Sequence, residues 1–374
     1  MTAAVDPTYP LYPIACLLAS LMLLFVLLTS LIRQNWNLGV AFLCFWLFWE
    51  NLTVGINAII WSNNAKVKLY IYCDITSHVQ LMTSIVRPMA TLIITRRLHL
   101  ITRLRSVELP GKSAKRRNLA IEWSLGLVIP MLVAGPFYYI VQGARFVVYA
   151  GTGCISTADN SLMGIILVRS WALVLPLLSI VLYYPQTIRI FYRQKRDINR
   201  FLQSNDSVSR MNYFRIFTLA SIDVILTLPI GIVSIALLVP ESLAQNDHHI
   251  PLYSGWTSLH SDWEPLGVSY AELVAVGKST TAETYFTLWT SPALAFAIFG
   301  LFGVTAEARA SYWGIICAVG GWFGWKPPVR PRKARSPMGT MEFGERPQDA
   351  SFNLDIEYGE LCVRKNFNVL TLDE

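Results

Sequence analysis

The amino-acid sequence predicts an all-α membrane protein, a bundle of seven transmembrane helices with its N-terminus outside the cell and its C-terminus in the cytoplasm. Three observations support this prediction. Of 374 residues, 53% are hydrophobic and only 15% are charged, whereas about a quarter of the residues of an average soluble domain are charged. The apolar residues gather in seven long runs. The basic residues gather in the connections on one side of these runs.

Each of the seven runs is long enough to cross a membrane. A helix rises about 1.5 Å per residue, so roughly 20 apolar residues span a hydrocarbon layer of about 30 Å. The last five runs contain prolines, which spanning helices tolerate because neighbouring groups satisfy the freed carbonyls. The first run is not expected to be a cleavable signal, because it is too long and no Lys or Arg precedes it. In chain order the runs are Leu11 to Ile32, Leu38 to Trp61, Ile71 to Thr95, Trp123 to Val141, Leu162 to Phe191, Ile216 to Val239 and Phe286 to Val304.

The basic residues predict the orientation of the bundle. Sixteen Lys and Arg residues lie in the connections after the first, third and fifth runs, counting Arg189 at the inner end of the fifth run, and the connections on the other side hold four. Because basic residues accumulate in cytoplasmic connections, the N-terminus is expected outside and the tail inside. The sequence is thus divided into a transmembrane part at 1–305, a short interfacial segment at 306–326 and a cytoplasmic, disordered tail at 327–374.

Two cysteines are predicted to face the outside of the cell. Cys73 opens the third run at its outer end, and Cys154 lies in the outer connection between the fourth and fifth runs. The outside of a cell is oxidising, so a disulfide between them is the preferred interpretation. Two free thiols are the alternative.

Ionisable side chains inside the membrane are costly, so each one calls for a partner or a function. Arg87 is eight residues from the inner end of the third run, and Asp223 is seven residues from the inner end of the sixth. These matching depths predict an ion pair that clamps the two helices together and whose rupture would switch the protein between two states. A static pair that only stabilises the bundle is the alternative, and Glu50 of the second run competes for Arg87.

Three polar residues at one depth are candidates for the floor of a ligand pocket. His78 and Arg169 lie about seven residues from the outer ends of the third and fifth runs, and Asn57 lies on the second. Ordinary hydrogen bonding between helices is the alternative for each of them.

The sequence offers no positive evidence for an enzyme, a cofactor or a nucleic-acid partner. It contains no phosphate-binding, metalloprotease or serine-hydrolase motif. The histidines and aspartate of residues 248–262 have no spacing that fixes a metal site, so no metal is expected. A small-solute transporter remains an alternative function, since Glu50, Arg87 and Asp223 would suit a polar pathway. Transporters usually have repeated halves, however, and none is visible here.

Five short motifs, taken in order and in their places, carry a family resemblance. They are Tyr72-Cys73-Asp74-Ile75 at the start of the third run, Leu92 to Leu98 at its end, Ser209 to Arg215 before the sixth, Trp256 to Trp263 in the last outer connection, and Phe299 to Tyr312 after the seventh. Together they cover about residues 10–313. In this the chain resembles the fungal lipopeptide mating-pheromone receptors, the a-factor receptor type.

This resemblance implies a class D G-protein-coupled receptor in the plasma membrane. Its ligand would be a farnesylated peptide pheromone from a compatible mating partner, and its intracellular partner a heterotrimeric G protein. A cluster of inner basic residues would then steer an acidic surface of that partner. The alternative for this cluster is the orientation signal itself, together with contact to anionic membrane lipid. The cluster consists of Arg96, Arg97, Arg116, Arg117, Arg193, Lys195, Arg196 and Arg215.

Overall fold

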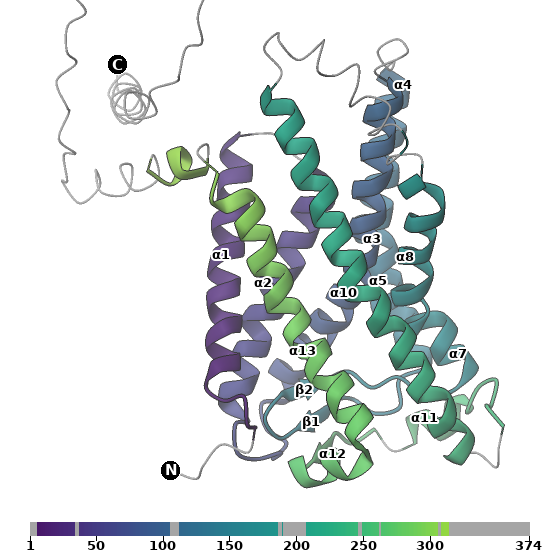
Figure 1. The fold of residues 1–374 in the computed structure, drawn as a ribbon. Helices are drawn as coiled ribbons and strands as arrows, with labels where there is room; N and C mark the ends of the chain where they lie inside the picture. The colour runs from purple at the N-terminus through teal and green to yellow at the C-terminus, as the bar shows by residue number, and fades with distance from the viewer. Residues whose placement is uncertain are drawn as a thin grey trace, which may run out of the picture. The chain divides into compact units, whose positions relative to one another are not determined.

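The computed structural model forms two compact units, Met1–Leu301 and Phe302–Glu374. The first unit contains nearly all of the described structure, and Figure 1 shows its helices as a bundle. Of the second unit, only the start of the segment that follows the bundle is described. The predicted tail therefore lies outside the described residues. The structure describes residues 6–33, 37–104, 112–185, 189, 207–245, 249–261, 263–305 and 308–313.

Five long helices form most of the bundle (Figure 1), and α3 packs against several of its other helices. It contacts α2, α10 and the later helix α8. One nearly continuous stretch of α3, from Leu81 to Ile94, is buried apart from Ser84. The helices are α1 (Leu11–Arg33), α2 (Leu38–Ile60), α3 (Tyr70–Leu104), α10 (Ser207–Gln245) and α13 (Lys278–Ile298).

The fourth predicted span is a chain of short helical pieces, because prolines interrupt its hydrogen bonding. Pro130 and Pro136 have no N–H to donate, and π-helical turns accompany both of them. Successive pieces follow one another without a gap from Lys112 to Ile140. They are α4 (Lys112–Trp123), η1 (Ser124–Val128), α5 (Ile129–Leu132), η2 (Val133–Phe137) and α6 (Tyr138–Ile140).

The fifth predicted span is bent by 53° between its two parts. The break is at Ser170, whose backbone N–H donates to the carbonyl of Ile165 over 2.7 Å, five residues back instead of four. The predicted run from Leu162 to Phe191 continues through the bend, so its length did not predict it. The parts are α7 (Leu162–Gly164), η3 (Ile165–Arg169) and α8 (Trp171–Leu182).

Five helices of the described chain are long and apolar enough to cross a membrane, and the bent pair makes a sixth if it counts as one span. They correspond to the predicted runs with the exception of the third. The helix α3 is absent from this group, and its sequence includes the ionisable residues Asp74, Arg87, Arg96 and Arg97. A mostly helical membrane protein is therefore confirmed, and the seventh span stays a prediction.

A small β-sheet, which the all-α prediction missed, lies at the same end of the bundle as the N-terminus (Figure 1). The strands are β1 (Val147–Tyr149), β2 (Gly153–Ile155) and β3 (Leu266–Val268), in the order β2-β1-β3. Strands β1 and β2 are antiparallel, and β3 pairs with β1 in parallel. The turn of the hairpin requires glycine, since Gly151 and Gly153 have φ of 90° and 81°. Strands of three residues are too short to show an alternating pattern in a sequence.

Candidate functional site

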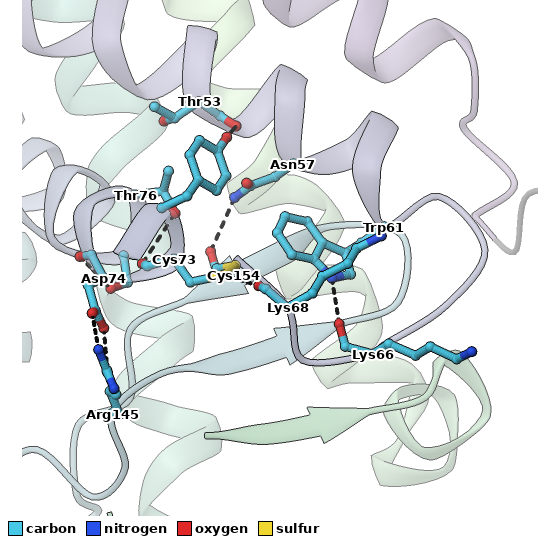
Figure 2. Close-up of a disulfide and its surroundings, with 12 residues drawn as sticks. Thr53, Asn57, Trp61, Lys66, Lys68, Cys73, Asp74, Thr76, Arg145 and Cys154 are labelled. Carbon is cyan, nitrogen blue, oxygen red and sulfur yellow. Dashed lines mark hydrogen bonds and ion pairs between the residues drawn. A yellow bond between two sulfur atoms is a disulfide. The ribbon is translucent and has the colours of Figure 1, made fainter. Parts of the chain in front are cut away.

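A disulfide lies at the end of the bundle that holds the β-sheet. The sequence predicts this end to face the outside of the cell, so it is called the outer end and the opposite one the inner end. Cys73, in the first turn of α3, is bonded to Cys154 of β2, with their Cα atoms 5.3 Å apart (Figure 2). Both cysteines are fully buried, in a cluster with Trp61, Phe146 and Val148. The structure thus contains the covalent link and not the two free thiols. The link fixes the β1–β2 hairpin to the central helix.

Two amide side chains of the helix bundle hold the same hairpin. Asn57 of α2 and Gln80 of α3 both donate to the carbonyl of Cys154, over 3.4 and 3.0 Å (Figure 2 shows the first). The hairpin approaches so closely that a Cβ added at Gly153 would lie 2.7 Å from the Cβ of Asn57. Asn57, a predicted ligand residue, is therefore fully buried beneath the loop.

An ion pair ties the hairpin to α3 a second time. The guanidinium of Arg145 donates to both carboxylate oxygens of Asp74, over 2.9 and 2.5 Å (Figure 2). These hydrogen bonds raise the pKa of Arg145 above its ordinary value, so the guanidinium is charged throughout the physiological range. About a third of each side chain is exposed (38% and 32%). We call the disulfide, this ion pair and the three-stranded sheet the outer cap.

The other two predicted ligand residues occupy different surroundings. Arg169 contacts Asn160 Oδ1 at 3.4 Å and the carbonyl of Ala158 at 3.5 Å, so it also supports the outer connection. His78 is exposed; its ring lies edge-on to Tyr138, with centroids 5.6 Å apart. The Tyr138 hydroxyl in turn accepts from the backbone N–H of Thr157 over 2.9 Å. Two of the three residues thus bond to the loop backbone, and only His78 presents its ring at the surface.

The last outer connection contains α11 (Trp256–His260) and α12 (Tyr270–Val276). His260 is stacked between Trp256 and Trp263, at centroid distances of 4.0 and 4.9 Å. The ring of Tyr139, at the end of the fourth span, lies edge-on to it at 5.1 Å. This histidine is therefore part of an aromatic stack. Among the described residues, no group of three or more metal-binding side chains is found; His248 and Asp262 lie outside them.

Deeper in the bundle, an ion pair joins α2 to α3. The Arg87 guanidinium lies 3.5 Å from a carboxylate oxygen of Glu50. Ser291 of α13 donates to the other oxygen of Glu50 over 2.6 Å, and Asn51 donates to Ser291 over 3.2 Å. All four side chains are buried. Three helices therefore meet at this cluster.

Asp223 of α10 bonds to α3 through a threonine. Its carboxylate accepts from the hydroxyl of Thr91, and from Thr227 of its own helix over 3.2 Å. This corrects the predicted pairing: Arg87 forms its ion pair with the competitor Glu50, and Thr91 provides the contact to Asp223. Thr91 is one helical turn from Arg87 and shares its face of α3. The polar core, as we name it, comprises Glu50, Asn51, Arg87, Thr91, Asp223, Thr227 and Ser291.

The predicted basic cluster divides into two groups at the inner end. Arg96 donates to Asn118 over 2.7 Å, and Arg97 lies 3.8 Å from the carboxylate of Glu122, so both connect α3 to α4. Arg116 and Arg117 are exposed on α4, and Arg215 is partly exposed on α10. Arg193, Lys195 and Arg196 lie outside the described residues.

The fold defines a multi-pass helical membrane protein with a disulfide-linked cap and a polar core. Comparison with known proteins identifies the family. A family model described as "Pheromone A receptor" matches residues 11–320. Since that match covers most of the chain, the protein belongs to this family. The resemblance seen in the sequence motifs is therefore confirmed.

Individual relatives agree with this assignment. The chain is 28% identical to the "Pheromone B alpha 3 receptor" of Schizophyllum commune over 83% of its own length and 49% of the relative's. It is 27% identical to "Pheromone receptor 1" of Mycosarcoma maydis, over 74% of this chain and 75% of that one. It is 22% identical to the "Pheromone a factor receptor" of Saccharomyces cerevisiae, over 74% of this chain and 55% of that one. The chain thus spans about half the length of the Schizophyllum receptor.

Proposed function

We propose that this protein is a G-protein-coupled receptor of the plasma membrane that binds a farnesylated peptide mating pheromone and signals through a heterotrimeric G protein. The observation that carries the proposal is the family match across residues 11–320, which includes all of the bundle. Relatives from three fungi are named as pheromone receptors. A transporter, the earlier alternative, is not favoured by any of these matches.

We further propose that α3 also crosses the membrane, which brings the number of spans to seven, and that the N-terminus lies outside. Its charged residues do not need to face lipid, because Arg87 is paired with Glu50 inside the bundle and Asp74 with Arg145 at the outer end. A helix surrounded by other helices tolerates such residues when they are paired. Epitope tags at the two termini, detected with and without permeabilisation, test this proposal. Accessibility of both tags from the same side would contradict it.

The two parts of a lipidated peptide have different roles in this proposal. Each carbon of a farnesyl chain gains about 0.8 kcal/mol when it leaves water, and membrane lipid provides nearly the same gain as a protein pocket. The lipid therefore concentrates the ligand at the membrane. Discrimination between mating partners comes from the peptide, since polar groups left unpaired against the outer surface penalise the wrong ligand.

Of the predicted ligand residues, His78 is the one proposed to touch the pheromone. Its exposed ring has Tyr138 at its side, whereas Asn57 and Arg169 are proposed to act indirectly, by positioning the outer connection through their bonds to its backbone. His78→Ala is expected to raise the pheromone concentration for half-maximal response by about tenfold, which corresponds to one lost contact of about 1.4 kcal/mol. His249→Ala, at another exposed histidine, is the matched control and is expected to respond like the parent.

The proposed contact with the G protein involves Arg116 and Arg117. Their side chains are exposed on α4, while Arg96 and Arg97 are engaged between α3 and α4. The same proposal includes four more basic residues because of their position in the sequence: Arg193, Lys195, Arg196 and Arg215. Charge reversal at Arg116 and Arg117 is expected to weaken signalling without changing pheromone binding. The same reversal at Lys66 and Lys68, on the outer side, is the control.

The decisive experiment uses cells that carry a pheromone-responsive G protein and a transcriptional reporter. Cells that produce this chain are exposed to a panel of synthetic fungal pheromones, each made with and without its farnesyl group. We expect a response to one or more lipidated peptides, and a much weaker response to the same peptides without lipid. Equal responses to both forms would contradict the lipopeptide assignment, and transport of a solute without any reporter response would favour the alternative.

A further inference from the structure

The charges of the polar core do not balance. Three of its side chains are ionisable, and all are buried: Glu50 is 8% exposed, Arg87 7% and Asp223 1%. With every group in its usual state, two carboxylates would face one guanidinium. A net charge buried within a bundle of apolar helices is unfavourable, because neither water nor lipid solvates it. The core therefore needs one more positive charge than its side chains supply.

The two carboxylates have different partners. Glu50 has a cation at 3.5 Å and a serine hydroxyl at 2.6 Å, which suits an ionised group. Asp223 has only neutral donors, the hydroxyls of Thr91 and Thr227. Asp223 is also the least exposed of the three ionisable groups. The unbalanced negative charge would therefore reside on Asp223.

Other groups that face α10 do not compensate this charge. The hydroxyl of Tyr184, beside α10 at the end of the fifth span, donates to Ser221 over 3.2 Å and is itself neutral. Glu283 of α13 contacts α10 at Ser234, eleven residues from Asp223 along the helix, and is acidic. Arg87 on α3 is near enough to attract the Asp223 carboxylate, but it forms its ion pair with Glu50. Among the described residues, no second cation is therefore at hand for Asp223.

We infer that Asp223 binds a proton in the resting structure, so that the polar core as a whole is neutral. A protonated carboxyl group can donate one hydrogen bond and accept others, so both threonine contacts stay satisfied. The protonated form is compatible with the contact between α3 and α10, which is made through hydroxyl groups and not through a salt bridge. This inference concerns the resting protein and is independent of which ligand it binds.

A bound metal cation would balance the charge equally well, but the surroundings of Asp223 favour a proton. Hard cations are usually held by about six or more oxygen ligands. The described contacts of Asp223 provide its own carboxylate and two threonine hydroxyls. The described residues also contain no cluster of three or more metal-binding side chains. A sodium ion bound at Asp223 is therefore the competing explanation, and the test distinguishes it from a bound proton.

Infrared spectroscopy of the full chain in lipid nanodiscs tests the inference directly. At neutral pH we expect the carbonyl stretching band of a protonated carboxyl group. This band should move when the protein is labelled with carbon-13 in the aspartate side chain, and should not move with labelled glutamate. It should disappear in Asp223→Asn. Asp6→Asn, which alters the other buried aspartate of the described residues, is the matched control and should keep the band.

Several results would overturn the inference. These are the absence of a protonated carboxyl band at neutral pH, a band that follows the glutamate label, or a band that is kept in Asp223→Asn. A thermal stability that rises with sodium but not with potassium, in a protein without the band, would assign the missing charge to a metal ion. If Asp223→Asn does not fold, the isotope labels and Asp6→Asn, which need no change at Asp223, still decide the question.

Discussion

The outer cap and the polar core both depend on charged and polar side chains, but they satisfy these groups in different ways. In the cap, Arg145 meets Asp74 one to one at a partly exposed position, and a disulfide holds the same hairpin. In the core, two nearly inaccessible carboxylates accompany one guanidinium, which forms its ion pair with Glu50 and not with Asp223. The cap is thus balanced and covalently closed, whereas the core is held by non-covalent contacts alone.

This difference indicates which region can change its state. Breaking the cap would require a covalent bond to be cleaved, so its geometry is fixed once the disulfide has formed. In the polar core, a hydroxyl-to-carboxyl hydrogen bond from Thr91 to Asp223 joins α3 to α10. With the proposed receptor function, a ligand bound at the fixed cap would move α10 by acting on a contact of this kind.

The largest effect is expected from removing the cation of the core. Arg87→Met leaves the Glu50 carboxylate buried without its ion-pair partner, and losing one partner of a buried pair typically costs about 3–5 kcal/mol. We therefore expect a large fall in the thermal stability of the purified protein. The double variant Glu50→Gln with Arg87→Met removes both charges and is expected to recover most of the loss. A double variant no better than Arg87→Met would show that the ion pair is not the reason.

Removing the disulfide is expected to have the next largest effect. The bond links residues 81 positions apart in the sequence, and removing a disulfide that closes a long loop typically costs about 2–5 kcal/mol. Cys73→Ala should therefore reduce both thermal stability and the amount of protein at the cell surface. Cys154→Ala and the double variant are expected to match it, because all three lose the same bond. Parent-like stability in either single variant would contradict a structural role for the cap.

A smaller effect is expected at the contact between α3 and α10. Thr91→Val keeps the side-chain shape but removes the hydroxyl that bonds to Asp223, and a buried polar group left without its partner costs about 1–3 kcal/mol. With the proposed receptor function, ligand-independent signalling should rise as α10 is released. Thr95→Val is the matched control, because the Thr95 hydroxyl bonds only to carbonyls of its own helix, at 2.9 and 3.1 Å. Equal reporter activity in both variants would argue against a switch at Thr91.

The sequence predicts the spans well because apolar length is a one-dimensional property. Runs of the right length identified every long helix of the bundle, and the placement of cysteines on the outer side identified Cys73 and Cys154 as partners. What it could not predict was local backbone geometry. The bend at Ser170 and the three-residue strands depend on hydrogen bonds between particular carbonyls and amides, which leave no pattern in composition.

The pairing inside the core shows a second limit. Counting residues from the helix ends gave Arg87 and Asp223 matching depths, but depth does not say which way a side chain points around the helix axis. Arg87 points to Glu50, and Thr91, one turn further on the same face, points to Asp223. A search of α3 for polar residues four positions from Arg87 would have found Thr91. Two amides, Gln80 and Asn57, meet at Cys154 for reasons that only the folded loop reveals.

The smallest effect is expected at the ion pair of the cap. Arg145→Gln removes a pair in which about a third of each side chain is exposed (38% and 32%), and exposed pairs contribute about 0.2–1 kcal/mol. The stability difference from the parent should shrink further as salt is added, because salt screens exposed charges. Lys66→Gln is the control, since it removes an exposed charge that forms no ion pair among the described residues. A loss at Arg145 as large as that in Arg87→Met would erase the distinction between the two regions, because the cap would then depend on charge as strongly as the core does.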